Sequence, residues 1–362
     1  MSKKDLKKSR RWRWLILIGA AIILTGVWQF AFHPFHEEEK ALRRQLRDAV
    51  ARKFPDQAAR VAASFGLHHF EPNRNKPQEK SPLDHPVVLI HGLDDPGKVW
   101  MNLAPALAGE AFDVWEMRYP NDQPVEESAR FFFEKLKVFK KLGTERIMIV
   151  AHSMGGLVAR EMLTNPALAY MQAVRTEDVP GVTGLIMVGT PNHGSEFARF
   201  RVFAEFRDQW VHAVKGKGHW LRWLLDGAGE AKIDLLPGNR FLTSLNARPH
   251  PEGVNMSIIA GIAGPVDEDE IGVLIKSLHE KLPDDTHTML DKLEGALTSA
   301  THGLGDGLVT VSSTRLDGIR HRTVNGTHRS IIRNISKDSV RVPPAVPIIV
   351  EQIKKSYGSP EG

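Results

Sequence analysis

A serine set in a sharp turn is the residue of this sequence best placed for chemistry. Ser153 lies in Ala-His-Ser-Met-Gly-Gly at 151–156, directly after the apolar run 147–150. That run predicts a buried strand, and the small Ala151 and Gly155 allow a tight turn into a helix with the serine at its tip. Glycine is more usual at the position of Ala151, but alanine adds only one methyl group. The pattern predicts a nucleophilic serine.

A serine hydroxyl is a poor nucleophile until a histidine, oriented by a carboxylate, removes its proton. The chain offers Asp306 in Gly-Asp-Gly-Leu-Val and His328 in Val-Asn-Gly-Thr-His, which gives the order Ser, Asp, His. Glycines on both sides of Asp306 fit a tight loop after a strand. Asn325-Gly326 predicts a turn that exposes His328 at a loop tip. We therefore predict that Ser153, Asp306 and His328 form a catalytic triad.

Other residues compete for these roles. His321 is the main alternative base, because it lies close to His328 in the chain. A denser group of carboxylates occurs at 267–270, but a run of like charge is more often a solvated loop. The same run lacks the spacing and glycine of an EF-hand calcium loop. We expect no metal site and no cofactor.

The oxyanion that develops during acyl transfer needs hydrogen-bond donors. The amide of Met154, directly after the serine, is one expected donor. The second is the amide of Leu93, which follows the apolar run 87–90, with Gly92 allowing close approach of the backbone. His91 is predicted to orient this loop rather than to catalyse.

Apolar runs alternate with helical periodicity along the body of the chain. Short apolar runs predict strands at 87–90, 112–119, 146–150, 185–188 and 256–260. Helical patterns follow at 128–142 and after Ser153, through Val158 and Met162. Strands separated by helices imply an α/β fold with a doubly wound, mostly parallel sheet. Active sites in such sheets lie at the carboxyl ends of the strands.

Composition and charge limit the classes of function. The 362 residues are 42% hydrophobic and 25% charged, which is ordinary for a globular protein. The net charge of +5 comes from residues 1–13, and the remaining chain carries 41 basic and 42 acidic residues. This balance gives no basic footprint for nucleic acid. The absence of cysteine excludes disulfides, thiolate metal sites and cysteine nucleophiles, and leaves the compartment open.

An apolar span follows the basic segment 1–13. Residues 14–32 would form a helix of roughly 29 Å, which matches a bilayer core of about 30 Å. Basic residues before the span and three glutamates at 37–39 after it place the amino terminus in the cytoplasm. The catalytic body is then expected on the periplasmic or extracellular side. A cleaved secretory signal is the alternative, but the span is longer than usual and lacks a good cleavage site.

The region 33–85 is predicted to connect the span to the body. Leu42, Leu46, Val50 and Phe54 recur every four residues, as in an amphipathic helix that ends near Pro55. Residues 71–85 are polar and proline-rich, which is typical of a linker or exposed loop. The catalytic domain is predicted at 86–356.

Taken together, these motifs resemble the α/β-hydrolase superfamily, and within it the lipase-like and GPI-inositol-deacylase-like (PGAP-type) branch. The similarity spans about residues 86–332, and its ordered motifs occur at 87–93, 151–156, 189–195 and 234–242. The resemblance implies the α/β-hydrolase fold and the same three catalytic residues. Asn239 stands where the family usually has serine, a change expected to affect loop structure more than chemistry.

A lid is predicted at about 196–250. This segment places large apolar residues at helical spacing: Phe197, Phe200, Phe203, Trp210, Trp220, Trp223 and Leu224. One interpretation is a helical cap over an apolar acyl pocket, which the resemblance favours. The other is that these residues pack on the core.

The leading functional prediction is a membrane-anchored serine hydrolase that cleaves carboxylic esters of acyl lipids through an acyl-enzyme. Expected partners are a lipid or small ester substrate and the membrane; the sequence indicates no nucleic acid and leaves protein partners unknown. One alternative is an acyltransferase with the same triad. The other is a non-catalytic, membrane-tethered binding protein with a hydrolase fold.

Overall fold

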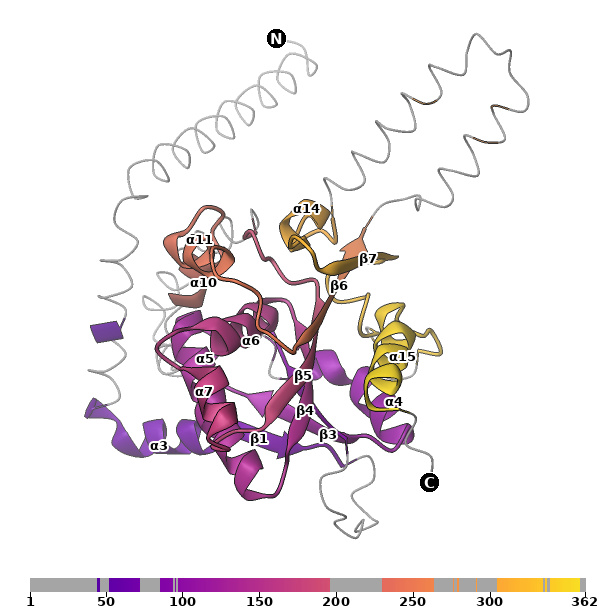
Figure 1. The fold of residues 1–362 in the computed structure, drawn as a ribbon. Coiled ribbons are helices and arrows are strands. Elements are labelled where there is room, and N and C mark those ends of the chain that lie inside the picture. Colours follow the sequence, from indigo (N-terminus) through magenta and orange to yellow (C-terminus); the bar gives the residue numbers. More distant parts are fainter. Residues whose placement is uncertain are drawn as a thin grey trace, which may run out of the picture.

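The described part of the chain has a central sheet covered by helices (Figure 1). The computed structural model describes residues 52–71, 85–195 apart from 94 and 96, 230–263, and 305–358 apart from 335, 337 and 338, with a few isolated positions.

Within these residues, seven strands form one sheet in the order β1-β3-β2-β4-β5-β6-β7. The strands are β1 (Gly66–His69), β2 (Pro86–Ile90), β3 (Asp113–Arg118), β4 (Arg146–His152), β5 (Gly181–Val188), β6 (Asn255–Ile262) and β7 (Arg320–Asn325). All neighbouring pairs are parallel except β1 and β3, which are antiparallel. The predicted α/β class and mostly parallel sheet are confirmed.

Continuous apolar sequence explains the three central strands. Every residue of β2 is buried, and so is every residue of β4 after Arg146, because helices cover both faces of a parallel sheet. The register pairs Ile90 with Ala151 and Ala151 with Met187. The carboxyl ends of β2, β4 and β5 therefore lie side by side at one edge of the sheet.

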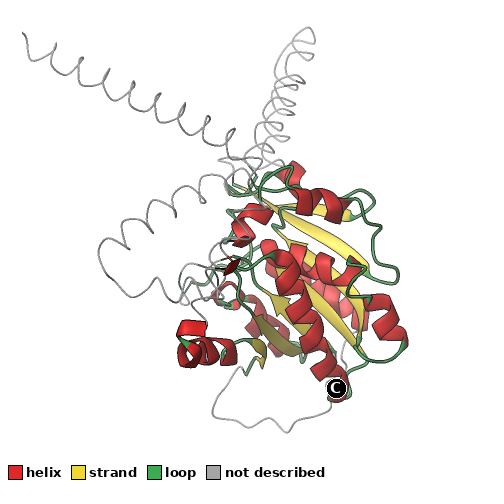
Figure 2. Cartoon of the chain, turned by 90° about the vertical axis from the view of Figure 1, so that its left-hand side faces the viewer, coloured by secondary structure: helices red, strands yellow, loops and turns green. Residues whose placement is uncertain are grey.

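Helices cover both faces of the sheet (Figure 2). They are α3 (Pro55–Ala63), α4 (Leu103–Gly109), α5 (Val125–Lys141), α6 (Met154–Thr164), α7 (Tyr170–Arg175), α10 (Glu230–Asp234), α11 (Arg240–Asn246), α14 (Val311–Thr314) and α15 (Ala345–Tyr357), with a short 3₁₀ helix η2 (Lys98–Trp100). One core layer joins the sheet to α5, α6 and α7, with α10 and α11 at its end. The opposite layer joins it to α4 and α15.

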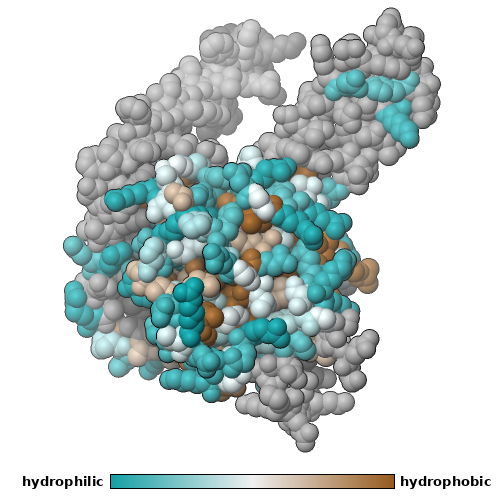
Figure 3. All heavy atoms as spheres, viewed as in Figure 1, coloured by the Kyte–Doolittle hydropathy of each residue, from teal (hydrophilic) through white to brown (hydrophobic). Residues whose placement is uncertain are grey.

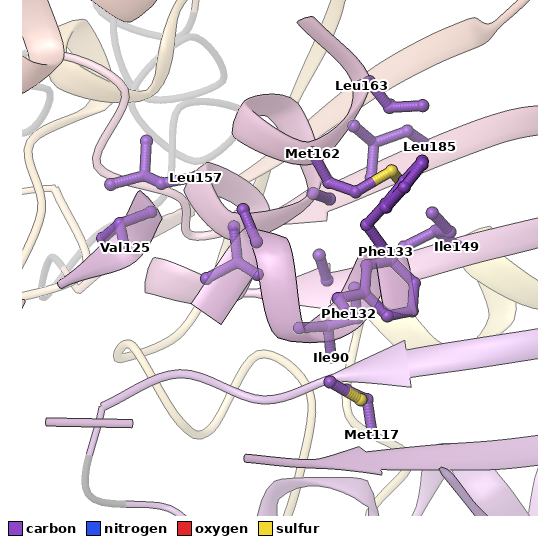
Figure 4. Close-up of a cluster of buried hydrophobic side chains, with 14 of the residues drawn as sticks. Ile90, Met117, Val125, Phe132, Phe133, Ile149, Leu157, Met162, Leu163 and Leu185 are labelled. Atoms are coloured by element: carbon purple, nitrogen blue, oxygen red, sulfur yellow. The ribbon is translucent and has the colours of Figure 1, made fainter. Parts of the chain in front are cut away.

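The α5 and α6 layer shows how these helices are held on the sheet (Figure 4). Phe132 and Phe133 from α5 and Met162 from α6 point toward Ile149 of β4 and Leu185 of β5. In addition, α5 begins with two glutamates and ends with two lysines, which complement the helix dipole. The helices predicted at 128–142 and after Ser153 are confirmed.

The start of the sheet differs from the sequence prediction. The sheet begins at β1, upstream of the predicted start at Pro86, because Gly66–His69 pairs with β3. Arg52 and Lys53 are helical and Phe54 is not, so a helix ends just before Pro55, as predicted. Pro55 then begins α3, because its fixed φ and missing N–H suit a first helical position. Most of the predicted amphipathic helix before Pro55 lies outside the described residues.

The predicted membrane span at 14–32 also lies outside the described residues. Among those that are described, no helix combines the length and apolar character needed to cross a bilayer.

Part of the predicted lid packs on the core. Residues 196–229, which hold its large apolar residues, lie outside the described part of the chain. Phe241, Leu242 and Leu245 of α11 are buried in the core layer of α5 and α6. The amide of Val125 donates to the Asp234 carboxylate at 3.0 Å and joins α10 to the start of α5. Residues 230–246 therefore pack on the core, and the lid at about 196–250 stays a prediction.

Candidate active site

Ser153 occupies a strained turn between β4 and α6. Its backbone has φ 55° and ψ −129°, a region that residues with side chains rarely adopt. The Ser153 amide donates to the Val188 carbonyl at the end of β5 at 2.8 Å, and the Gly156 amide donates to the Ser153 carbonyl at 3.0 Å. Strain of this kind costs on the order of 1–3 kcal/mol and is concentrated at functional sites.

Glycines after the serine make the turn possible. A Cβ on Gly155 would collide with the carbonyl oxygens of Ile90 and His91, and one on Gly156 would collide with the side chain of Thr190. Ala151, two residues before the serine, is fully buried. The structure therefore requires small residues on both sides of Ser153, as the sequence indicated.

Asp306 and His328 form a buried hydrogen-bonded pair. His328 Nδ1 lies 2.7 Å from Asp306 Oδ2. The other carboxylate oxygen, Oδ1, accepts from the amides of Leu308 at 2.9 Å and Val309 at 2.8 Å. Because the carboxylate can only accept, Nδ1 donates, and this leaves Nε2 of the neutral imidazole as the basic atom.

The end of β5 brings this pair to the serine turn. Val188 accepts the Ser153 amide, and the next residue, Gly189, has φ 60°. A Cβ on Gly189 would lie 3.1 Å from Asp306 Oδ2 and 3.2 Å from His328 Nδ1. The serine turn and the Asp306–His328 pair therefore share one edge of the sheet.

His152 makes a second connection between the two. Its Nε2 donates to the His328 carbonyl at 2.9 Å, and the two rings are 4.7 Å apart. Burial lowers the pKa of His152 well below its ordinary value, and the nearby His328 lowers it further. Among described residues, Ser153 Oγ forms no hydrogen bond with the His328 ring; such contacts are often looser before substrate binds.

His328 is less exposed than the sequence indicated. The Asn325-Gly326 segment was predicted to present it at a loop tip, but only 7% of the residue is exposed. The His328 amide donates to the Asp306 carbonyl at 2.9 Å. The loop therefore folds back onto Asp306 instead of projecting into solvent.

Of the competing residues, the structure describes His321. His321 lies within β7, and its Nε2 is 2.8 Å from the Thr314 hydroxyl of α14. The carboxylates at 267–270 lie outside the described residues. No group of three or more potential metal ligands occurs among the described side chains.

The two segments that carry the expected oxyanion donors both adjoin Ser153. Met154 is the first residue of α6, so its amide has no acceptor in a preceding helical turn. The loop after β2 approaches the serine closely, because a Cβ on Gly92 would lie 2.7 Å from Ser153 Cβ and 3.2 Å from Ser153 Oγ. Leu93 follows directly in that loop.

His91 and Tyr119 support the loop after β2. The Tyr119 hydroxyl donates to the His91 carbonyl at 2.6 Å, and the two rings stack with centroids 4.6 Å apart. His91 Nδ1 donates to the Gly92 carbonyl at 2.8 Å. Burial lowers the pKa of His91 to about 4, so the ring is neutral near pH 7. These contacts fit the predicted orienting role.

Sequence reasoning gave no role to the segment 189–195, although it contributed to the resemblance. Asn192 accepts from Arg160 of α6 at 2.9 Å and donates to the Thr314 carbonyl at 2.7 Å. Ser195 donates to the Leu308 carbonyl at 2.5 Å. The segment is therefore hydrogen-bonded to α14 and to the loop that carries Asp306. Its position directly after a predicted strand was the available signal.

Two further polar residues have structural roles. Asn239 caps α11 by accepting from the Phe241 amide at 2.6 Å, which agrees with the expected effect on the loop. Glu161 is fully buried on α6 and pairs with Arg248 at 2.7 Å. Burial raises the pKa of Glu161, while the Arg248 charge opposes that shift.

Comparisons with known proteins agree with this architecture. Residues 87–291 match the model of the alpha/beta hydrolase family. Triacylglycerol lipases of Pseudarthrobacter phenanthrenivorans and Burkholderia plantarii are each 28% identical to the chain over 126 residues. These alignments cover 32% of this chain and 36% and 32% of the two lipases, so the chain spans about a third of their length.

Two solved lipase structures are similar to the chain at low sequence identity. The mature lipase BlEst2 of Bacillus licheniformis shares 18% identity and a TM-score of 0.48, over 79% of this chain and 97% of that one. The Staphylococcus hyicus lipase shares 14% identity and a TM-score of 0.48, over 78% and 97%. Since the family match spans more than half of the sequence, the chain belongs to the alpha/beta hydrolase family.

Proposed function

We propose that the protein is a serine hydrolase that cleaves carboxylic esters, with Ser153 as nucleophile, His328 as base and Asp306 as the residue that orients the base. The observation that carries this proposal is the buried Asp306–His328 pair, 2.7 Å apart, at the same sheet edge as the strained Ser153 turn. Nucleophile, base and orienting acid follow the order of this fold.

The proposed reaction has two halves. Ser153 Oγ attacks the ester carbonyl while its proton passes to His328 Nε2, and the amides of Met154 and Leu93 bind the oxyanion. The C–O bond to the alcohol then breaks, and His328 returns the proton to the leaving oxygen. Water repeats the sequence on the acyl-enzyme and releases the acid and free Ser153.

The proposed substrate is an ester of an acyl lipid. The partial similarity to two triacylglycerol lipases supports this choice. The motifs shared with the lipase-like and GPI-inositol-deacylase-like branch also support it, and we place the chain there as part of the proposal.

We further propose that residues 14–32 anchor the enzyme in a membrane, with the catalytic domain on the non-cytoplasmic side. The apolar length of this span and the seven basic residues before it support the topology. Deleting residues 1–35 should release a protein active on short dispersed esters but not on bilayer substrates. Protease added outside the cytoplasmic membrane should digest the catalytic domain; a protected domain would reverse the topology.

The test of the activity is turnover of esters of graded acyl length by the detergent-solubilised full chain. Ser153→Ala should abolish release of free acid while the circular dichroism spectrum stays unchanged. The matched control is Ser312→Ala, which removes an exposed hydroxyl from α14. Turnover that survives Ser153→Ala would overturn the proposal.

A further inference from the structure

The loop between β7 and α15 presents an exposed surface next to the proposed base. The exposed Arg329 directly follows His328, and the half-buried Arg333 lies one turn later, with its amide donating to the Arg329 carbonyl at 2.9 Å. Val340, Arg341 and Val342 lie where the loop returns toward α15. We name these five residues the arginine–valine surface.

Hydrogen bonds hold the two arms of this loop side by side. Arg341 Nη1 donates to the Ser330 carbonyl at 2.9 Å, and Asn334 Nδ2 donates to the Arg341 carbonyl at 2.6 Å. The Ala345 amide donates to the Ile331 carbonyl at 2.9 Å. The arginines and valines are therefore neighbours, although the chain separates them.

The loop is also fixed to the catalytic domain. Ile331 and Ile332 are fully buried in the core layer of α4 and α15. The Asn334 amide donates to Asn102, just before α4, at 2.7 Å. A surface carried on this loop keeps its position relative to the site.

Two apolar side chains project from this surface. Val340 is 99% exposed and Val342 is 65% exposed, more than any other large hydrophobic residue in the described part of the chain. Figure 3 shows a small hydrophobic group at the right-hand edge, at the level of β7 and α15, bordered by hydrophilic atoms. Isolated exposed valines are common, but here they flank an arginine.

The three arginines have no ion-pair partner among the described carboxylates. In contrast, Lys137 pairs with Glu134, and Lys354 pairs with Glu110. Arg329 directly follows His328, so the surface adjoins the loop that carries the proposed base. The surface therefore combines arginines that pair with none of the described carboxylates with exposed apolar groups beside the site.

We propose that the arginine–valine surface docks the catalytic domain on a bilayer containing anionic phospholipid. Arginine forks match phosphate geometry, and apolar side chains beside them can enter the headgroup region. A soluble anionic substrate would explain the arginines, but it would leave the exposed valines without a role. The inference rests on the proposed function in one respect: docking brings the site to a lipid ester.

The experiment reconstitutes the full chain in vesicles of phosphatidylcholine alone or with phosphatidylglycerol, an anionic lipid. The readout is the rate on a fluorogenic acylglycerol in the bilayer divided by the rate on dispersed 4-nitrophenyl butyrate. This ratio corrects for any change at the catalytic residues. Phosphatidylglycerol should raise the ratio for the unmodified protein.

Substitutions assign the effect to the surface. Arg329→Gln and Arg333→Gln together should reduce the gain from phosphatidylglycerol by about fivefold for each arginine. Val340→Ser should lower the ratio in both kinds of vesicle. The matched charge control is Arg146→Gln with Arg175→Gln, which alters exposed arginines at the amino end of β4 and the carboxyl end of α7. The apolar control is Val138→Ser on α5, half-exposed on another face.

The outcomes separate the two proposals. Equal ratios in both kinds of vesicle, or a surface variant that behaves like its control, would overturn docking while leaving ester hydrolysis intact. A defect seen only with dispersed anionic esters would mean that the arginines bind a substrate group, and would also overturn docking. Loss of Ser153-dependent turnover on every ester would instead refute the proposed function.

Discussion

The two halves of the candidate site are built in different ways. The serine turn comes from one continuous segment, β4 to α6, and its geometry depends on backbone strain at Ser153 and on Gly155. The Asp306–His328 pair comes from two loops, at the carboxyl ends of β6 and β7. Hydrogen bonds rather than strain define those loops.

The loops of the pair are tied to each other and to the sheet. The Ala263 amide donates to the Gly305 carbonyl at 2.6 Å, and the Gly326 amide donates to the Ile262 carbonyl at 2.9 Å. Asp306 thus reaches the end of β6 although residues 264–304 intervene in the chain. A short continuous segment thus forms the turn that carries Ser153, whereas His328 and Asp306 are positioned by contacts between elements that lie far apart in the chain.

The largest expected loss of activity comes from a substitution in the Asp306–His328 pair. Asp306→Asn should slow ester turnover by about 10⁴-fold, because the amide cannot hold the same histidine tautomer or stabilise its cation. Steady-state kinetics with a soluble ester measures this loss. Asp317→Asn, an exposed control, should turn over normally. A loss below about tenfold would assign the orienting role to another acid.

A second prediction concerns the loop after β2 and pH. The ordinary pKa of 6.5 is lowered to about 4 for buried His91. At a pH between about 4 and 6.5, His91 binds a proton in the unfolded chain but not in the folded chain. Folding stability should therefore fall as pH drops from 6.5 to about 4, by about 3 kcal/mol from this residue.

His91→Phe keeps an aromatic ring against Tyr119 but cannot titrate. The free energy of unfolding of this variant should therefore change less between pH 6.5 and about 4. Urea unfolding across the pH range provides the measurement. His250→Phe removes an exposed histidine and serves as the control. Identical slopes for the unmodified protein and His91→Phe would contradict the assignment of this pH dependence to His91.

On the serine side, Gly155→Ala should destabilise the protein by about 2 kcal/mol, because the new methyl group meets the Ile90 and His91 carbonyl oxygens. Turnover should fall as well, since the tip that carries Ser153 must shift. Thermal unfolding and kinetics on the same sample separate the two losses. Gly109→Ala enters open space at the end of α4 and should be neutral or stabilising. A fully active, fully stable Gly155→Ala would refute the account of the turn.

The smallest expected effect comes from Tyr119, which supports the loop after β2. Tyr119→Phe removes the hydrogen bond to the His91 carbonyl and should cost about 1 kcal/mol, with a roughly fivefold lower kcat. Tyr170→Phe is a matched control, because its hydroxyl also bonds to backbone, at Pro180 and Val182, but remote from the site. The control should lose stability and keep kcat. Equal kcat losses would show that the effect is not specific to the loop.

The comparison also explains what the sequence could predict. The turn was predictable because its requirements, small residues after an apolar strand, lie within ten positions at 147–156. The central strands were predictable because burial on both faces demands continuous apolar sequence. By contrast, β7 was missed: its residues alternate between exposed and half-buried and include Arg320 and Arg322.

The surroundings of the pair were not predictable. Asn325-Gly326 correctly indicated a turn, but no local pattern shows that the turn folds back and buries His328 against Asp306. Neither could the sequence give the support of the Asp306 loop by Ser195, which is 113 positions from Leu308. Such contacts depend on packing between distant elements, and periodicity carries no information about them.

The most direct test of the central claim is labelling of the full chain with a fluorophosphonate, followed by peptide mapping. We expect a single label on Ser153, formed rapidly in the unmodified protein and in His321→Ala, and nearly abolished in His328→Ala. Label on another serine, or rapid labelling of Ser153 in His328→Ala together with a loss in His321→Ala, would contradict it.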